Sequence, residues 1–196
     1  MPDEENGHAL VPLFGETQEV SEWGSEAQQM DPEFYRNGGV SLSGSELEAL
    51  GEIRGRKVLV LTAGTGEDVA SLANLGADVT VVDDEASLHA PRALAASAEV
   101  EVNFVVGDSR ILSDSFRIGD YDVVYSGFGS IDWVNDLTAW AAGIEASLKQ
   151  GGRLLVYDEH PFSHVFDEAD GQLVPVNSYF GPDLEDMEDD GDDDST

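Results

Sequence analysis

One stretch of the sequence decides the fold: Leu61-Thr62-Ala63-Gly64-Thr65-Gly66-Glu67-Asp68. It follows a short apolar run that is typical of a buried strand, and it precedes a helical pattern. Glycines at such a junction let the backbone pass close to a ligand and aim the N–H groups of the helix N-terminus at that ligand. Alone, the pair Gly64 and Gly66 is weak evidence for a nucleotide site.

A carboxylate further along the chain strengthens this interpretation. Asp83 ends the next predicted strand, nineteen residues after Gly64. This is close to the separation at which an acidic residue reaches ribose hydroxyls in nucleotide-binding folds. A dinucleotide fingerprint would need a third glycine, but Val69 occupies that position. A nucleoside site is therefore favoured over a pyrophosphate site.

From Lys57 onward, strand and helix patterns alternate, which is the signature of parallel βαβ units. In the third predicted strand, Val100, Val102, Phe104 and Val106 alternate, and we expect them on one face. The predicted strands are Val58–Leu61, Val79–Val82, Val100–Val106, Tyr121–Tyr125 and Leu154–Tyr157.

Helical patterns lie between these strands. Val69, Leu72 and Ala73 share a face, and Gly76 is placed to end that helix. A longer apolar stripe runs from Leu137 to Leu148 and is closed by Gly151 and Gly152. We therefore predict an α/β fold, a Rossmann-like doubly wound and mostly parallel sheet of about five strands with helices on both faces.

Two shorter signals complete the predicted helices. The segment 86–97 is helical in composition, and Pro91 must either start or kink that helix. Ser43 and Glu46 form a capping box, which predicts a short helix ending near Gly51. The segment Phe166 to Phe180 has no clear period.

The charge is strongly negative, with 41 Asp and Glu residues against 9 Lys and Arg, a formal net charge of −32. Such a surface repels phosphate backbones and anionic lipid, so we expect no nucleic-acid and no membrane partner. Without cysteine, disulfide, thiol-nucleophile and thiolate-metal chemistry are excluded. We expect an acidic cytoplasmic protein, and the two lysines suggest adaptation to a salt-rich cytoplasm as in a halophile.

The flanks differ from the body in composition. Residues 1–33 predict a partly ordered N-terminal arm, and residues 34–181 predict the ligand-binding domain. Residues 182–196 predict a disordered acidic tail, because Asp183 to Thr196 holds nine acidic residues and no basic one.

With these motifs in place, the chain resembles the class I S-adenosylmethionine-dependent methyltransferases from about Phe34 to Phe180. The matching places follow the family's order: its first motif, its second strand with the ribose acid, its adenine-binding turn, its fourth strand, its Leu-Lys-Pro-Gly-Gly turn and a substrate-side loop. They are Val58–Asp68, Val79–Asp83, Gly107-Asp108-Ser109, Tyr121–Ser126, Leu148–Leu154 and Glu159–Phe162.

The resemblance implies S-adenosylmethionine as cofactor, S-adenosylhomocysteine as product and a small-molecule acceptor. It implies cofactor contacts from Thr62, Ala63, Gly64, Thr65, Gly66, Asp83, Asp84, Asp108, Ser109 and Ser126. A general base would stand near the transferred methyl group if the acceptor is a hydroxyl or amine. His160 is the first candidate, with Asp158 and Asp132 behind it; Tyr35, Phe128 and Trp133 are candidates for a lid or an acceptor contact. We predict no metal site.

The sequence also departs from the family pattern. Val60 replaces the acid often found inside the first motif, and Thr62 replaces that motif's first glycine. The usual two further strands are missing, unless Leu173 to Tyr179 supplies a partial substitute. The open sheet edge would then be covered by the N-terminal arm or by a second copy of the chain in a homodimer.

These departures keep a second function open. In that alternative the chain is a family member that has lost methyl transfer. It would bind S-adenosylmethionine or no cofactor, and act as a partner subunit or as a template for another reaction such as a cyclisation.

Overall fold

Five parallel strands form the centre of the molecule. The computed structural model describes residues 31–179, apart from 113, 128–129, 159 and 170–171. The spatial order β3-β2-β1-β4-β5 confirms the predicted sheet and places its switch point between β1 and β4. The strands are β1 (Lys57–Leu61), β2 (Asp78–Asp83), β3 (Asn103–Val106), β4 (Tyr121–Ser126) and β5 (Leu148–Val156).

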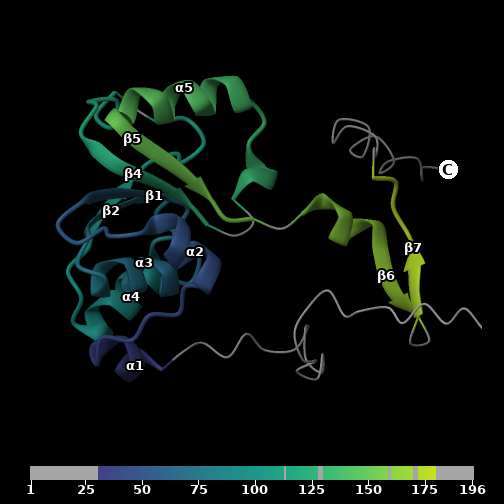
Figure 1. Cartoon of the computed structure of the whole chain (residues 1–196), viewed down its shortest axis with the longest axis horizontal. Helices are drawn as coiled ribbons and strands as arrows, with labels where there is room; N and C mark the ends of the chain where they lie inside the picture. The colour runs from purple at the N-terminus through teal and green to yellow at the C-terminus, as the bar shows by residue number, and fades with distance from the viewer. Residues whose placement is uncertain (1–30, 113, 128–129, 159, 170–171, 180–196) are drawn as a thin grey trace, which may run out of the picture.

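Helices cover both faces of this sheet, as predicted. Figure 1 shows α5 on one side of the strands and α1 to α4 on the other. The helices are α1 (Pro32–Arg36), α2 (Gly44–Leu50), α3 (Glu67–Asn74), α4 (His89–Ala98) and α5 (Leu137–Ser147), and a 3-10 turn, η1 (Ile131–Trp133), precedes α5.

The central strand β1 explains why the sheet is buried on both faces. Its side chains alternate between two apolar clusters: Val58 and Val60 pack on the side of α2 and α3, while Leu59 and Leu61 pack with Trp140 of α5. A strand buried in this way reads as a continuous apolar run. The apolar stretch ahead of the glycine turn is therefore the strand that positions the turn.

Several predicted helix boundaries are confirmed. The Ser43–Glu46 capping box is present at the start of α2, which ends at Gly51. Gly76, with φ of 88°, follows the end of α3. Pro91 lies in the first turn of α4, so it starts the helix and does not kink it.

Three predicted boundaries are wrong. β5 begins at Leu148 and not at Leu154, because Leu148 already pairs with Tyr121 of β4. β3 begins at Asn103 and not at Val100, because the backbone N–H of Val100 bonds the Ala95 carbonyl, 3.1 Å away, and closes the end of α4. Val106 is 55% exposed and does not join an apolar face. Helix α5 ends at Ser147, ahead of the predicted glycines, because Leu148 is extended and already begins β5.

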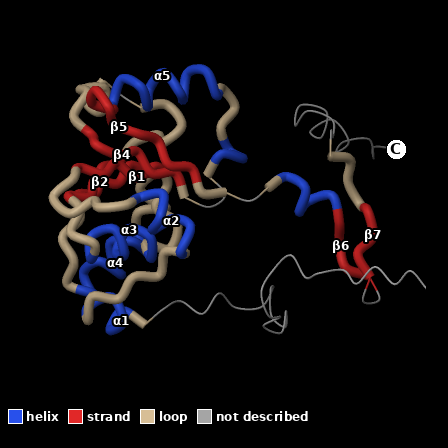
Figure 2. The backbone as a smooth tube through the Cα atoms, in the orientation of Figure 1, coloured by secondary structure: helices blue, strands red, loops and turns tan. Residues whose placement is uncertain are grey.

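The last described strands stand apart from the main sheet. After the 3-10 turn η2 (Pro161–Val165), β6 (Phe166–Ala169) pairs antiparallel with β7 (Gln172–Pro175) in a separate two-stranded sheet. Figure 2 shows this hairpin away from the five strands. The segment from Leu173 therefore does not replace the missing strands, and β5 is the outermost strand of the main sheet among the described residues.

None of the helices in the described part of the chain has both the length and the apolar character needed to cross a membrane. The predicted arm and tail lie almost wholly outside the described residues.

Candidate functional site

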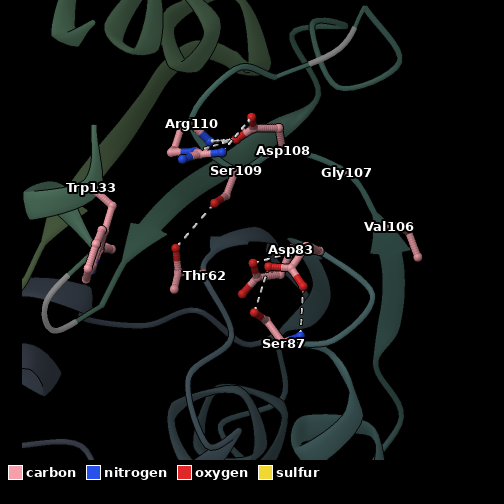
Figure 3. A pocket seen from close by; sticks show the side chains of 11 residues that line it. Thr62, Asp83, Ser87, Val106, Gly107, Asp108, Ser109, Arg110 and Trp133 are labelled. Carbon is pink, nitrogen blue, oxygen red and sulfur yellow. Dashed lines mark hydrogen bonds and ion pairs between the residues drawn. The ribbon is translucent and has the colours of Figure 1, made fainter. Parts of the chain in front are cut away.

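A cavity of about 550 Å³ opens at the carboxyl ends of the strands. Its walls come from the segments that follow β1, β2, β3 and β4, so the switch point of the sheet lies beneath it (Figure 3). The lining residues are Thr62, Asp83, Asp84, Ser87, Val106, Gly107, Asp108, Ser109, Arg110, Ser130 and Trp133.

The turn after β1 takes a route that glycine favours. Thr62, Gly64 and Gly66 all have positive φ, of 72°, 50° and 94°. A side chain on Gly64 would meet no atom within 4 Å, so the backbone there faces open space. A Cβ on Gly66 would lie 2.7 Å from the Pro91 Cα, so this glycine allows α3 and α4 to pack closely.

Asp83 joins this turn to the end of β2. Its Oδ2 accepts the backbone N–H of Ala63 at 2.8 Å, and its Oδ1 accepts the N–H of Asp84 at 2.9 Å. The residue is only 7% exposed, yet it lines the cavity. Each carboxylate oxygen has a second lone pair, so Asp83 can still accept hydrogen bonds from a ligand. The turn and the acid therefore meet on one wall, as their spacing predicts.

The neighbouring Asp84 is occupied by the turn that leads to α4. Its carboxylate accepts the backbone N–H groups of Ala86 and Ser87, each at 2.9 Å, and the Ser87 hydroxyl at 2.8 Å. These bonds, first of all the backbone bond from Ser87, lower the pKa of Asp84 below its ordinary value. Asp84 therefore orients the turn and adds negative charge to the cavity.

On the opposite wall, Asp108 is bound by Arg110. The Arg110 Nε lies 2.9 Å from Oδ1 and Nη2 lies 3.1 Å from Oδ2, a bidentate pair. The hydrogen bond from Arg110 lowers the pKa of the Asp108 carboxyl. Figure 3 shows the pair above Ser109, whose hydroxyl lies 3.3 Å from the Thr62 hydroxyl.

Ser126, at the end of β4, lies beneath the cavity. It is fully buried, and its hydroxyl bonds that of Ser130, which lines the cavity and donates to the Gly127 carbonyl at 2.7 Å. Ser126 thus contributes to the wall through Ser130.

The comparisons with known proteins agree with this geometry. Residues 58–152 match the family model described as a methyltransferase domain. An uncharacterized methyltransferase, YbaJ of Bacillus subtilis, is 32% identical over 139 residues, which are 69% of this chain and 54% of the relative. The demethylmenaquinone methyltransferase of Beutenbergia cavernae is 34% identical over 113 residues, 56% of this chain and 43% of the relative.

A solved structure extends the likeness to the fold. The S-adenosylmethionine-dependent methyltransferase from Mesorhizobium loti superposes with a TM-score of 0.57 at 22% identity, over 69% of this chain and 63% of that protein. This chain belongs to the class I S-adenosylmethionine-dependent methyltransferase family. It spans about half the length of the curated relatives that it matches.

Family members use S-adenosylmethionine. Asp68, at the end of the stretch that matches the family's first motif, belongs to a hydrogen-bonded group with Tyr125 and Glu46. The Tyr125 hydroxyl donates to Glu46 Oε1 at 2.5 Å and lies 3.1 Å from Asp68 Oδ2. Burial raises the pKa of Asp68, and burial with both carboxylates nearby raises that of Tyr125. The other Glu46 oxygen caps α2 at the Ser43 N–H, 2.8 Å away. This group ties α2 to α3 and β4 behind the turn.

The structure does not bring every predicted residue to the cavity. Tyr35 is fully buried among Ala70, Leu94 and Ala98, and its hydroxyl bonds Ser41 at 3.1 Å, so it packs α1 and is not a lid over this cavity. Thr65 is exposed at the tip of the turn.

Two of the candidate bases lie in segments after β5. His160 is exposed, accepts the Phe162 N–H at 3.1 Å and stacks on Tyr179. Asp158 accepts the Ile131 N–H at 3.2 Å. Neither lines the cavity as described. Phe128 and the Asp132 side chain lie outside the described part of the chain.

Four lining residues were not predicted as site residues from the sequence: Ser87, Val106, Arg110 and Ser130. Two had a readable local signal. A serine three residues after Asp84 suits a side-chain turn, and an arginine two residues after Asp108 can fold back on it. Within the described residues, no group of three His, Asp or Glu side chains is arranged to hold a metal ion.

Proposed function

We propose that this chain binds S-adenosylmethionine in the cavity of Figure 3 and transfers its methyl group to a small-molecule acceptor. The observation that carries the proposal is the hydrogen bond from the Ala63 N–H to Asp83 Oδ2, at 2.8 Å. Because it joins the glycine turn to the acid at the cavity wall, both can contact one nucleoside sugar.

The chain's own residues would hold and align this ligand. Asp83 would accept the ribose hydroxyls, the start of the turn at Thr62 would face the ligand, and Asp108 with the backbone of Ser109 would bind the adenine. S-adenosylmethionine supplies an electrophilic methyl group when bound, so alignment accounts for much of the acceleration and no protein nucleophile is needed.

The charges around the cavity suit a cationic cofactor. Three carboxylates line it, those of Asp83, Asp84 and Asp108, against the single guanidinium of Arg110 among the described lining residues. A sulfonium is attracted by this surplus of negative charge, and the neutral sulfur of the product is attracted less. The cavity therefore favours the cofactor over its product.

The acceptor would enter beside Trp133. This side chain is 72% exposed, lines the cavity and follows β4 on η1, whose first N–H is held by Asp158. A small apolar acceptor is consistent with an exposed indole and with the relative named demethylmenaquinone methyltransferase. His160 and Asp158 stay proposals for the base, which would have to approach from the segment after β5.

A non-methylating family member is the second candidate. Two observations favour it: the described cavity-lining residues include no histidine, and the main sheet ends at β5 among the described strands. Such a protein would bind S-adenosylmethionine without transferring its methyl group.

We also propose a homodimer through the open edge of β5, and a cytoplasmic, salt-adapted protein on the strength of its net charge of −32. A monomeric mass in solution would contradict the proposed homodimer. If the protein were fully stable without added salt, the proposed salt adaptation would be contradicted.

Titration calorimetry with S-adenosylmethionine, S-adenosylhomocysteine and NAD tests the main proposal over a range of salt concentrations. We expect saturable heat with the first two ligands and none with NAD. No heat with either adenosyl ligand would contradict the proposal. Binding without methyl transfer to a broad acceptor panel would favour the second candidate.

A further inference from the structure

Thr62 has a backbone conformation that suits glycine. Its φ of 72° lies in the left-handed region, where a β-branched side chain is strained. Among the described residues, the only other non-glycine residue with positive φ is Glu99, at 58°. Glu99 ends α4, where this conformation is common, whereas Thr62 follows a strand. The strain at Thr62 therefore needs another explanation.

Hydrogen bonds of the turn fix this conformation. The Thr62 N–H bonds the Val82 carbonyl at 3.3 Å, the Ala63 N–H bonds Asp83, and the Gly66 N–H bonds the Ala63 carbonyl at 2.9 Å. All of these are backbone donors, so glycine at position 62 could make them equally well. The threonine side chain is not required for the route of the chain.

Packing does not offset the strain either. Thr62 is only partly buried and belongs to none of the three apolar clusters. Its hydroxyl meets that of Ser109 at 3.3 Å, longer than the 2.7–2.8 Å at which hydroxyl bonds are usual. Both hydroxyls line the cavity and can donate and accept. Their remaining hydrogen-bonding capacity is therefore available to a ligand in the cavity.

The position of this hydroxyl pair indicates which part of a ligand it meets. Thr62 directly precedes the residue bonded to Asp83, and Ser109 directly follows Asp108. Figure 3 shows the two hydroxyls facing each other between these acids. A group held by Asp83 at one end and Asp108 at the other must pass the pair, and in the proposed ligand that group is the adenosine.

We propose that the Thr62 and Ser109 hydroxyls bind the nucleoside of the ligand, and that Thr62 stands in a glycine conformation because of this contact. The inference rests on the proposed function. Since the nucleoside is common to cofactor and product, the contact contributes equally to both. The Thr62 side chain would then lower the stability of the fold and raise the affinity for ligands that contain the nucleoside.

Six variants test this on the full chain, with affinity from calorimetry and stability from thermal unfolding without ligand. Ser109→Ala and its combination with Thr62→Val examine the second hydroxyl. Thr62→Val removes the hydroxyl and keeps the shape. Thr62→Ser keeps the hydroxyl. Thr62→Gly removes both side chain and strain. Glu99→Gly, the matched control, relieves the other positive φ at a residue that does not line the cavity. The ligands are S-adenosylmethionine, S-adenosylhomocysteine and 5′-methylthioadenosine.

We expect Thr62→Val to weaken all three ligands alike, by roughly tenfold, the effect of one hydrogen bond. Thr62→Ser should bind within about twofold of the original chain. Thr62→Gly should melt roughly 2–4 °C higher and bind more weakly. Glu99→Gly should also have a higher melting temperature, and its affinity for the three ligands should equal that of the original chain. Ser109→Ala combined with Thr62→Val should cost less than the sum of the single changes, because the two hydroxyls share one contact.

Three results would overturn the inference. Unchanged affinity in Thr62→Val would show that the hydroxyl binds nothing. A loss confined to S-adenosylmethionine would assign the contact to the sulfonium. A Thr62→Gly variant that is no more stable would remove the strain on which the argument depends. If the original chain binds none of the three ligands, the proposed function fails and the inference with it.

Discussion

Asp122 and Asp83 lie at opposite ends of the parallel sheet and are held in different ways. At the amino end, Asp122 accepts Arg56 Nη1 at 2.9 Å and the Lys57 N–H at 3.0 Å, and pairs with the Lys149 ammonium. At the carboxyl end, Asp83 accepts two backbone N–H groups and, among the described residues, makes no ion pair.

This difference separates a structural acid from an available one. Burial opposes ionisation of Asp122, but the bonds from Lys149, Lys57 and Arg56 outweigh it and lower its pKa to about 2. Asp83 is held in place by two backbone N–H groups and lines an open cavity, so its remaining lone pairs are available to a ligand. In a chain with 41 acidic residues, the partners of a carboxylate indicate its role better than its presence does.

The largest expected effect is on ligand affinity at the carboxyl end. Asp83→Asn removes the charge that would meet the ribose and places an amide N–H₂ toward a backbone N–H. We expect S-adenosylhomocysteine to bind roughly 100-fold more weakly, measured by calorimetry. Asp122→Asn is the matched control and should leave this affinity unchanged. Equal losses of affinity for S-adenosylhomocysteine in both variants would contradict the different roles assigned to the two acids.

The next effect is on stability at the amino end. Asp122→Asn should lower the free energy of unfolding by about 1–2 kcal/mol in denaturant titrations at neutral pH, because it leaves two cations without their shared partner. The lowered pKa also fixes the sign of the pH dependence. Stability from Asp122 is complete above its ordinary value of 3.8 and is lost as the pH falls toward about 2. If the free energy of unfolding of Asp122→Asn fell at low pH as steeply as that of the original chain, this assignment would be contradicted.

A smaller effect of opposite sign concerns Asp68, behind the turn. Its raised pKa means that the folded state binds the proton more tightly, so stability falls as the pH rises through that pKa. We expect Asp68→Asn to stay within about 1 kcal/mol of the original chain at neutral pH and to flatten this decline. Tyr125→Phe, which deletes the hydroxyl between the carboxylates, should instead destabilise the protein. Denaturant titrations at several pH values measure the free energy of unfolding of both variants. If it declined with rising pH in Asp68→Asn as it does in the original chain, the assignment to Asp68 would be refuted.

The smallest effect is expected at an exposed ion pair. Arg92 pairs with Glu85 at 3.0 Å, and both side chains are substantially exposed. Arg92→Ala should change the free energy of unfolding by about 0.5 kcal/mol, since exposed ion pairs contribute little. A loss as large as that of Asp122→Asn would show that exposure does not set the scale of these contributions.

Local signals in the sequence predicted most of the fold. The apolar run before Thr62 predicted β1, Ser43 and Glu46 predicted the start of α2, and Gly76 predicted the end of α3. Such features depend on neighbours a few residues apart. β3 was predicted too long because Val100 has the alternation of a strand, yet its backbone N–H bonds the Ala95 carbonyl and closes α4.

The site was predictable where it depends on the turn and on Asp83. It was not predictable where partners come from distant segments. Tyr125 and Glu46 are far apart in sequence and meet only in the folded chain. Nothing in the sequence showed that Tyr35 of α1 would be fully buried. The positive φ of Thr62 was not predicted either, although Thr62 occupies the position of the motif's first glycine.

A crystal structure of the full chain with S-adenosylhomocysteine tests the central claim most directly. We predict that the ribose hydroxyls lie within hydrogen-bonding distance of the Asp83 carboxylate, with the sugar against the turn formed by residues 62–66. A ligand seated elsewhere, or a ribose that leaves Asp83 facing solvent, would contradict the account.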